Sequence, residues 1–400
     1  MIPGSTRTRI LTALALLWLA GTALRLTILA VPPAIPSIHD DLHLSATEVG
    51  ILTGLPSMLL ALAAVPGSLL IAQLGAAPAL VAGLILCAVG GALRGIVADI
   101  NVLYGMTVIM GAGVAIMQVA MPPVVRLWAP KRIGFATALY TNGMLIGEIL
   151  PVALMIPVVL PLTGSWQWAF VFWSVPVAII ALLVVLLAPR RANSDTDAPA
   201  ARRRWWPDWN DSLIWKLGIM LGSANALYFG TNAFIPDYLN HTGQGEWISA
   251  TLTALNVGQL PASFVLLAAA DRLQGKAWPY AACGILGTLA LFGVIAGSSV
   301  VLVLSAAFIG FVCASILVLA LALPPLLAQP DDVHRITAAM FTISYSCAVI
   351  APVISGAVWD LTGIPQSAFV PFIVMNMTLI VLAPSIRHTL RHEADPVRPG

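Results

Sequence analysis

Residues 189–212 read PRRANSDTDAPAARRRWWPDWNDS and form the longest polar stretch in a chain that is otherwise mostly apolar. Of its 400 residues, 59% are hydrophobic and 9% charged, and the mean hydropathy is +0.94. A soluble domain has about a quarter of its residues charged, so most of this surface is unsuited to water. The composition indicates a membrane protein, and the net charge of +2 gives no reason to expect a nucleic acid partner.

Outward from this stretch, the sequence offers six long apolar runs on each side. They centre near residues 22, 60, 87, 113, 146, 177, 225, 259, 288, 312, 347 and 376. A bilayer core of about 30 Å requires about 20 apolar helical residues, and continuous apolar runs favour helices over a β-barrel. We predict an all-α polytopic membrane protein with twelve transmembrane helices, in two six-helix halves at 1–188 and 213–400 joined by a cytoplasmic linker at 189–212.

The distribution of Lys and Arg predicts the orientation. With the N-terminus inside, the expected outer loops contain acids and no Lys or Arg, as the positive-inside rule requires. The expected cytoplasmic segments then hold 17 of the 19 cations: Arg7, Arg9, Arg126, Lys131, Arg132, Arg190, Arg191, Arg202, Arg203, Arg204, Lys216, Arg272, Lys276, Arg335, Arg387, Arg391 and Arg398.

An internal repeat with an offset of roughly 200 residues supports two equivalent halves. LP at 55–56 matches LP at 260–261, AMPP at 120–123 matches ALPP at 322–325, and KRI at 131–133 matches HRI at 334–336. The repeat predicts two parallel six-helix units with a substrate site near the midplane.

Several stretches of the first half resemble a known family. They are ALRLT at 23–27, PAIP at 33–36, DLHLS at 41–45 and GILTGLP at 50–56, with GAG at 111–113 and GFATALYT at 134–141. They are similar to the first two spans and to the fourth and fifth spans of the cyanate permease and 2-nitroimidazole transporter family of the major facilitator superfamily. The resemblance implies a bacterial inner-membrane carrier of a small anion or of a compact nitrogen-containing aromatic compound.

Three charged residues fall inside the expected spans: Arg25, Arg94 and Glu148. An intramembrane charge needs a partner or a watery cavity. Arg25 and Glu148 lie about three and two residues beyond the centres of spans one and five, so a rise of 1.5 Å per residue places them at similar depth. Arg94 is near the outer end of span three and close to Asp99, which favours snorkelling to the interface.

The resemblance implies that spans one and five border the central cavity. Arg25 is then a candidate to bind an anionic substrate, because guanidinium matches a carboxylate-like anion, and Glu148 is a candidate to carry a coupling proton. The alternative is that Arg25 and Glu148 form a buried ion pair that fixes the packing of the first half without touching substrate.

Polar and aromatic residues near the midplane are further substrate-binding candidates. Asn225, Tyr228 and Asn232 share a face of span seven, as Asn256, Gln259 and Ser263 do on span eight. Tyr345 lies near the middle of span eleven, Gln118 in span four and Tyr140 in span five. The alternative role for each is hydrogen bonding between helices.

We therefore expect a secondary transporter of a small anion or compact nitrogen-containing compound, working by alternating access with proton coupling or exchange. The alternative is proton-driven efflux of neutral or weakly basic aromatic compounds, with Arg25 as the structural partner of Glu148. The sequence lacks HExxH, GxSxG and phosphate-loop motifs, so we expect neither an enzyme nor an ATP-driven pump. We expect a monomer in the lipid bilayer with a small-molecule substrate, protons as a further partner, and no cofactor or metal; Cys87, Cys283, Cys313 and Cys347 lie in apolar runs without metal-site spacing.

Overall fold

The computed structural model describes residues 6–43, 46–189 and 204–394. The chain divides into two compact units. The first takes in the described residues up to Pro207 together with Ala328–Ala338, and the second takes in Asp208–Leu327 and the described residues from Ala339 onward. Residues 190–203, which include Arg190, Arg191, Arg202 and Arg203 of the expected linker, lie outside the described residues. The exact domain boundaries stay a prediction.

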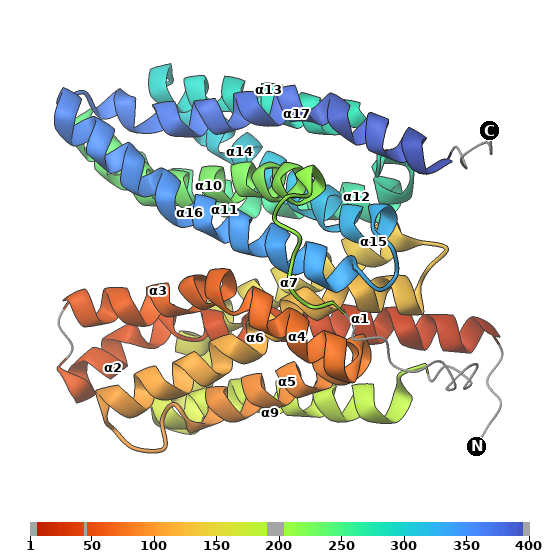
Figure 1. The fold of residues 1–400 in the computed structure, drawn as a ribbon. Coiled ribbons are helices and arrows are strands. Elements are labelled where there is room, and N and C mark those ends of the chain that lie inside the picture. Colours follow the sequence, from red (N-terminus) through yellow and green to blue (C-terminus); the bar gives the residue numbers. More distant parts are fainter. Residues whose placement is uncertain (1–5, 44–45, 190–203, 395–400) are drawn as a thin grey trace. The chain divides into compact units, whose positions relative to one another are not determined.

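Long helices make up both units (Figure 1). The first unit contains α1 (Thr6–Leu29), α2 (Ile35–Leu42), α3 (Ala46–Leu62), α4 (Ala64–Leu74), α5 (Ala76–Leu93), α6 (Ile100–Trp128), α7 (Ile133–Leu154), α8 (Leu160–Thr163) and α9 (Trp166–Leu187). A π-helical turn at Met155–Val159 joins α7 to α8. The second unit contains α10 (Ser212–His241), α11 (Ile248–Val257), α12 (Gln259–Leu273), α13 (Ala277–Ala296), α14 (Val300–Leu321), α15 (Leu323–Leu327), most of α16 (Val333–Thr362) and α17 (Val370–Ala394).

All twelve predicted span centres lie within these helices, so the predicted fold class is confirmed. Within the described part of the chain, ten helical segments are long and apolar enough to cross a membrane, and the bent pair α3–α4 makes an eleventh. The remaining predicted span centre lies in α10, which is 30 residues long but carries polar side chains and is not among these segments. The exposed face of α9 is apolar along its length, as a lipid-facing surface requires: Phe172, Val175, Ile179, Leu182 and Leu186.

Spans two and eight are both interrupted, and a proline follows each break. The part of α3 from Leu55 to Leu62 meets α4 at 54°, and Pro66 is the third residue of α4. In span eight the break is at Gly258, and Pro261 is the third residue of α12. A proline ring removes the hydrogen bond to the carbonyl four residues earlier and crowds it, which is a common cause of such kinks.

The two units pair their helices in the same way. In the first, α5 packs between α6 and α9, α3 and α4 pack on α6, and α1 packs on α7, α6 and α9. In the second, α13 packs between α14 and α17, α11 and α12 pack on α14, and α10 packs on α14 and α17. Apart from the contact of α1 with α7, the two lists correspond span for span, in agreement with the twofold repeat in the sequence.

The closest approach in the first unit is between α1 and α7. A methyl group added to Gly21 would lie 2.0 Å from the carbonyl oxygen of Tyr140, and one added to Gly147 would lie 2.2 Å from that of Thr22. Only glycine allows two helix backbones to come so near. This contact brings the side chains along the α1–α7 seam within reach of one another.

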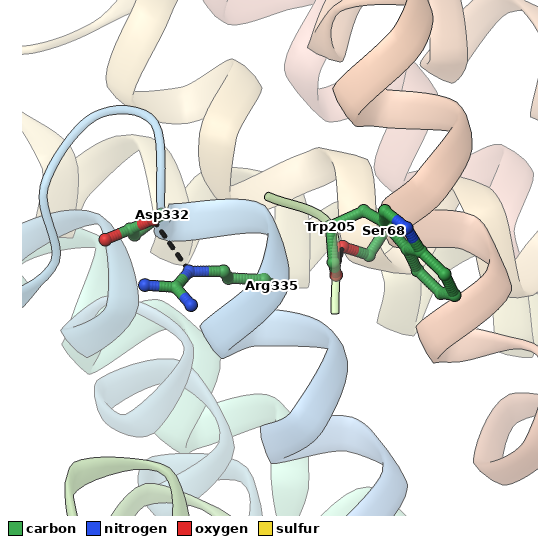
Figure 2. A network of polar contacts seen from close by, with 4 residues as sticks. All are labelled: Ser68, Trp205, Asp332 and Arg335. Carbon is green, nitrogen blue, oxygen red and sulfur yellow. Dashed lines mark hydrogen bonds and ion pairs between the residues drawn. The ribbon is translucent and has the colours of Figure 1, made fainter. Parts of the chain in front are cut away.

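Two polar contacts of the first unit involve α4 and the start of α16 (Figure 2). Ser68 Oγ of α4 donates a 2.7 Å hydrogen bond to the Trp205 carbonyl. Asp332 and Arg335 form an ion pair of 2.7 Å at the start of α16. The Trp205 contact fixes the described end of the linker to α4.

Candidate functional site

The Arg25 and Glu148 side chains meet across the α1–α7 seam. Arg25 Nε lies 3.3 Å from Glu148 Oε1. The two side chains keep 14% and 29% of their surface exposed, so the ion pair is largely but not wholly enclosed. Arg25 and Glu148, which the sequence predicted to lie at similar depth in the membrane, are thus in direct contact.

A second polar contact crosses the same seam. Trp18 Nε1 donates a hydrogen bond of 3.0 Å to Asn142 Oδ1, and Asn142 is buried. Trp18, Thr22 and Arg25 follow one another at four- and three-residue spacing, which places them on one face of α1. Sequence reasoning missed Trp18 and Asn142, although that spacing was a signal for Trp18.

The other first-unit candidates, Gln118 of α6 and Tyr140 of α7, are enclosed by packing. Both are buried, and Gln118 Oε1 makes no hydrogen bond within the structure. An unpaired buried amide oxygen is costly, which makes Gln118 the more unusual of the two.

The snorkelling predicted for Arg94 is wrong. Its side chain is 0% exposed and lies among α1, α5 and α9. Its Nη2 donates a 2.7 Å hydrogen bond to the Thr27 carbonyl, and its guanidinium carbon lies 4.3 Å from the centre of the Phe170 ring. Asp99 instead caps α6, accepting hydrogen bonds from the first-turn amides of Asn101 and Val102. Packing by α9 over the end of α5, which the sequence of α5 does not reveal, encloses the guanidinium.

In the second unit, three of the predicted candidates are linked by hydrogen bonds. Tyr228 Oη of α10 donates to Asn256 Oδ1 of α11 at 2.7 Å. Asn256 Nδ2 in turn lies 3.3 Å from Asn232 Oδ1, and Asn256 is exposed. The group lies just before the break at Gly258 and contains no charged side chain.

The remaining second-unit candidates point to other neighbours. Asn225 Nδ2 donates to Ser344 Oγ of α16 at 2.8 Å, so Asn225 does not join Tyr228 and Asn232. Tyr345 is buried and stacks on Phe341 with ring centres 6.1 Å apart. Gln259, like Ser263, is buried at the start of α12. Ser344 was missed by sequence reasoning, because a serine among apolar residues carries no distinctive signal.

Known proteins resemble this chain over most of its length. The model of the Major Facilitator Superfamily matches residues 17–254. An uncharacterised transporter of Bacillus subtilis strain 168 is 27% identical over 90% of this chain and 88% of its own length. The cyanate transport protein of Escherichia coli K12 is 25% identical over 66% of this chain and 67% of its own, and the 2-nitroimidazole transporter of the same organism is 26% identical over 63% of each. The resemblance to that family is confirmed.

Solved structures agree on the fold. The Escherichia coli fucose:proton symporter matches with a TM-score of 0.68 at 13% identity, covering 94% of this chain and 97% of that chain. The human organic anion transporter matches with a TM-score of 0.69 at 15% identity, covering 95% of this chain and all of that one. At these identities the likeness concerns the fold alone. The family model covers more than half of the sequence, the relatives are transporters and the helices pair as a twofold repeat, and the chain therefore belongs to the major facilitator superfamily.

Proposed function

We propose that this multi-pass membrane transporter carries a small anion or a compact nitrogen-containing compound by alternating access, with the substrate and a proton bound together at the Arg25–Glu148 pair. The contact between these two side chains, 3.3 Å apart and partly exposed, is the observation that carries the proposal. The curated names of two relatives, a cyanate transport protein and a 2-nitroimidazole transporter, support the substrate class.

Charge balance supplies the coupling. In the empty carrier the guanidinium of Arg25 and the carboxylate of Glu148 neutralise each other. A monoanion that takes the place of the carboxylate on Arg25 leaves Glu148 with an unpaired charge, which is costly in a membrane interior. Uptake of one proton by Glu148 removes that charge, so the empty site and the site loaded with anion plus proton have the same net charge.

The proposal is tested in proteoliposomes containing a trapped pH-sensitive dye. Sodium cyanate and 2-nitroimidazole are added outside, and acidification of the lumen reports movement of protons with substrate. We expect Arg25→Met to abolish the signal for cyanate and Glu148→Gln to uncouple cyanate flux from protons.

The pair Asp332–Arg335 offers a matched control. Its side chains are 15% and 31% exposed for Arg335 and Asp332, close to the values for Arg25 and Glu148. Thermal stabilisation of purified protein by cyanate measures binding separately from transport. Arg335→Met should retain this stabilisation, and its full retention in Arg25→Met would refute the anion-binding role.

The second candidate function is proton-driven efflux of neutral or weakly basic aromatic compounds. The uncharged group of Tyr228, Asn232 and Asn256 favours it, because hydroxyl and amide groups bind neutral heterocycles without a counter-charge. In that case Arg25 only holds Glu148 in place. Efflux of 2-nitroimidazole that is proton-driven and lost in Asn256→Leu, but unaffected by external cyanate, would favour this function over the first.

The orientation belongs to the proposal as well. We infer a monomer in a bacterial inner membrane with both termini in the cytoplasm. The one-sided distribution of Lys and Arg in the sequence supports the orientation of the termini.

A further inference from the structure

Arg94 is a fully buried guanidinium that has no carboxylate within ion-pairing distance among the residues that the structure describes. Its hydrogen bonds go to two main-chain carbonyls instead. Nη2 contacts the oxygen of Thr27 at 2.7 Å, and Nε contacts that of Gly91 at 3.4 Å. A buried cation without a compensating partner costs several kcal/mol, so the identity of what balances Arg94 is informative.

Both carbonyls belong to the last turns of helices. Thr27 is in the final turn of α1, which ends at Leu29, and Gly91 is in the final turn of α5, which ends at Leu93. The carboxyl end of a helix carries roughly half a negative charge. Two such ends together offset about one guanidinium charge, and the Phe170 face of α9 adds a cation–π contact. Arg94 therefore acts as a common cap for two helices.

Arg94 binds the end of α1 at a main-chain carbonyl. The amide of Val31 bonds to the Ile28 carbonyl at 3.3 Å, and the Thr27 carbonyl instead accepts from Arg94. Thr27 is also held by its hydroxyl, which lies 3.2 Å from Cys87 Sγ of α5. Arg25 is only two residues before Thr27, in the same terminal stretch of the helix.

We propose that Arg94 is a positioning residue for the Arg25–Glu148 pair. By binding the ends of α1 and α5 to each other and to α9, it fixes the turn of α1 that presents Arg25 to Glu148. This rests on the proposed function for the role of the pair in transport. The positioning itself requires no substrate.

A double-mutant cycle in the absence of ligand tests it. Thermal unfolding of purified protein is measured for Glu148→Gln, Arg94→Lys and the double variant. Lysine keeps the charge, and with it the long-range attraction to Glu148, but loses the planar fork that reaches both carbonyls. We expect the shift in melting temperature caused by Glu148→Gln to fall by at least half in the Arg94→Lys background. Additive shifts in melting temperature would overturn the proposal, because the effects of two substitutions add when the residues neither touch nor depend on each other.

Trp166→Phe is the matched control. It removes a 3.0 Å hydrogen bond to Asp41 in the same unit and keeps a ring beside Phe170. Its effect should add to that of Glu148→Gln. If Trp166→Phe reduced the effect of Glu148→Gln on the melting temperature as much as Arg94→Lys does, the coupling would reflect general loosening of the first unit. That result would overturn the specific role of Arg94.

The buried thiol of Cys87 gives a second readout that is independent of transport. Because it lies against Thr27, release of the α1 end should expose it. We expect Arg94→Lys to increase the rate of Cys87 alkylation by N-ethylmaleimide about tenfold, which corresponds to about 1.4 kcal/mol of local opening. An unchanged rate would overturn the proposal. Cyanate uptake by Arg25→Met bears only on the proposed function, so the two failures are distinguishable.

Discussion

Replacing Arg25 by methionine leaves the Glu148 carboxylate without its guanidinium, in a setting where water reaches only part of it. Removing one partner of a fully buried ion pair costs about 3–5 kcal/mol, whereas an exposed pair contributes about 0.2–1 kcal/mol. The side chains here are 14% and 29% exposed. Between these limits and nearer the buried one, we expect Arg25→Met to lower the free energy of unfolding by about 2–3 kcal/mol.

The assay is thermal or denaturant unfolding followed by tryptophan fluorescence, with the single variants Arg25→Met and Glu148→Leu beside the double variant. An apolar pair needs no counter-charge, so the double variant should be more stable than Arg25→Met alone. The deficit of Arg25→Met should also shrink as the pH is lowered, because a proton then neutralises the orphaned carboxylate. A double variant that is less stable than either single one, by the sum of their effects, would refute the reasoning that the two side chains act as one pair.

Two further predictions concern backbone contacts in the first unit. Gly147→Val places a side chain where a Cβ would lie 2.2 Å from the Thr22 carbonyl oxygen. The substitution should force α1 and α7 apart, lower the free energy of unfolding by about 1–3 kcal/mol and reduce the yield of monodisperse protein on size exclusion. A normal yield with an unchanged melting temperature would contradict the close packing. Ser68→Ala removes the 2.7 Å hydrogen bond to the Trp205 carbonyl and should accelerate tryptic cleavage after the exposed Arg204, whereas an unchanged cleavage rate would show that this bond does not hold the segment.

Several features of the site were recognisable before any fold was known. A charge inside an apolar run is conspicuous because so few occur, and the fixed rise of a helix converts sequence position into depth. This was sufficient to select Arg25 and Glu148 as a candidate pair. Helical spacing likewise grouped Tyr228 with Asn232 on one face of α10.

Partners across helices were beyond such reasoning. Asn225 shares sequence spacing with Tyr228, yet it bonds to Ser344 of α16 rather than joining the group around Asn256. Spacing defines a face of one helix, whereas the neighbour that covers each point of that face depends on rotation and packing. The same limit explains why Asn142 and Ser344 were missed.

Arg94 shows most clearly what the sequence determines and what only the tertiary structure decides. The sequence by itself determined the helical spans, because the bilayer imposes length and hydropathy on them and these are properties of local sequence. Short motifs in the same sequence indicated the twofold repeat and the family. Only the tertiary structure decided that the Arg94 guanidinium is enclosed between the ends of α1 and α5 beneath Phe170. Whether a charge near a helix end reaches water or is buried depends on the helices packed around it, and that information lies in residues distant along the chain.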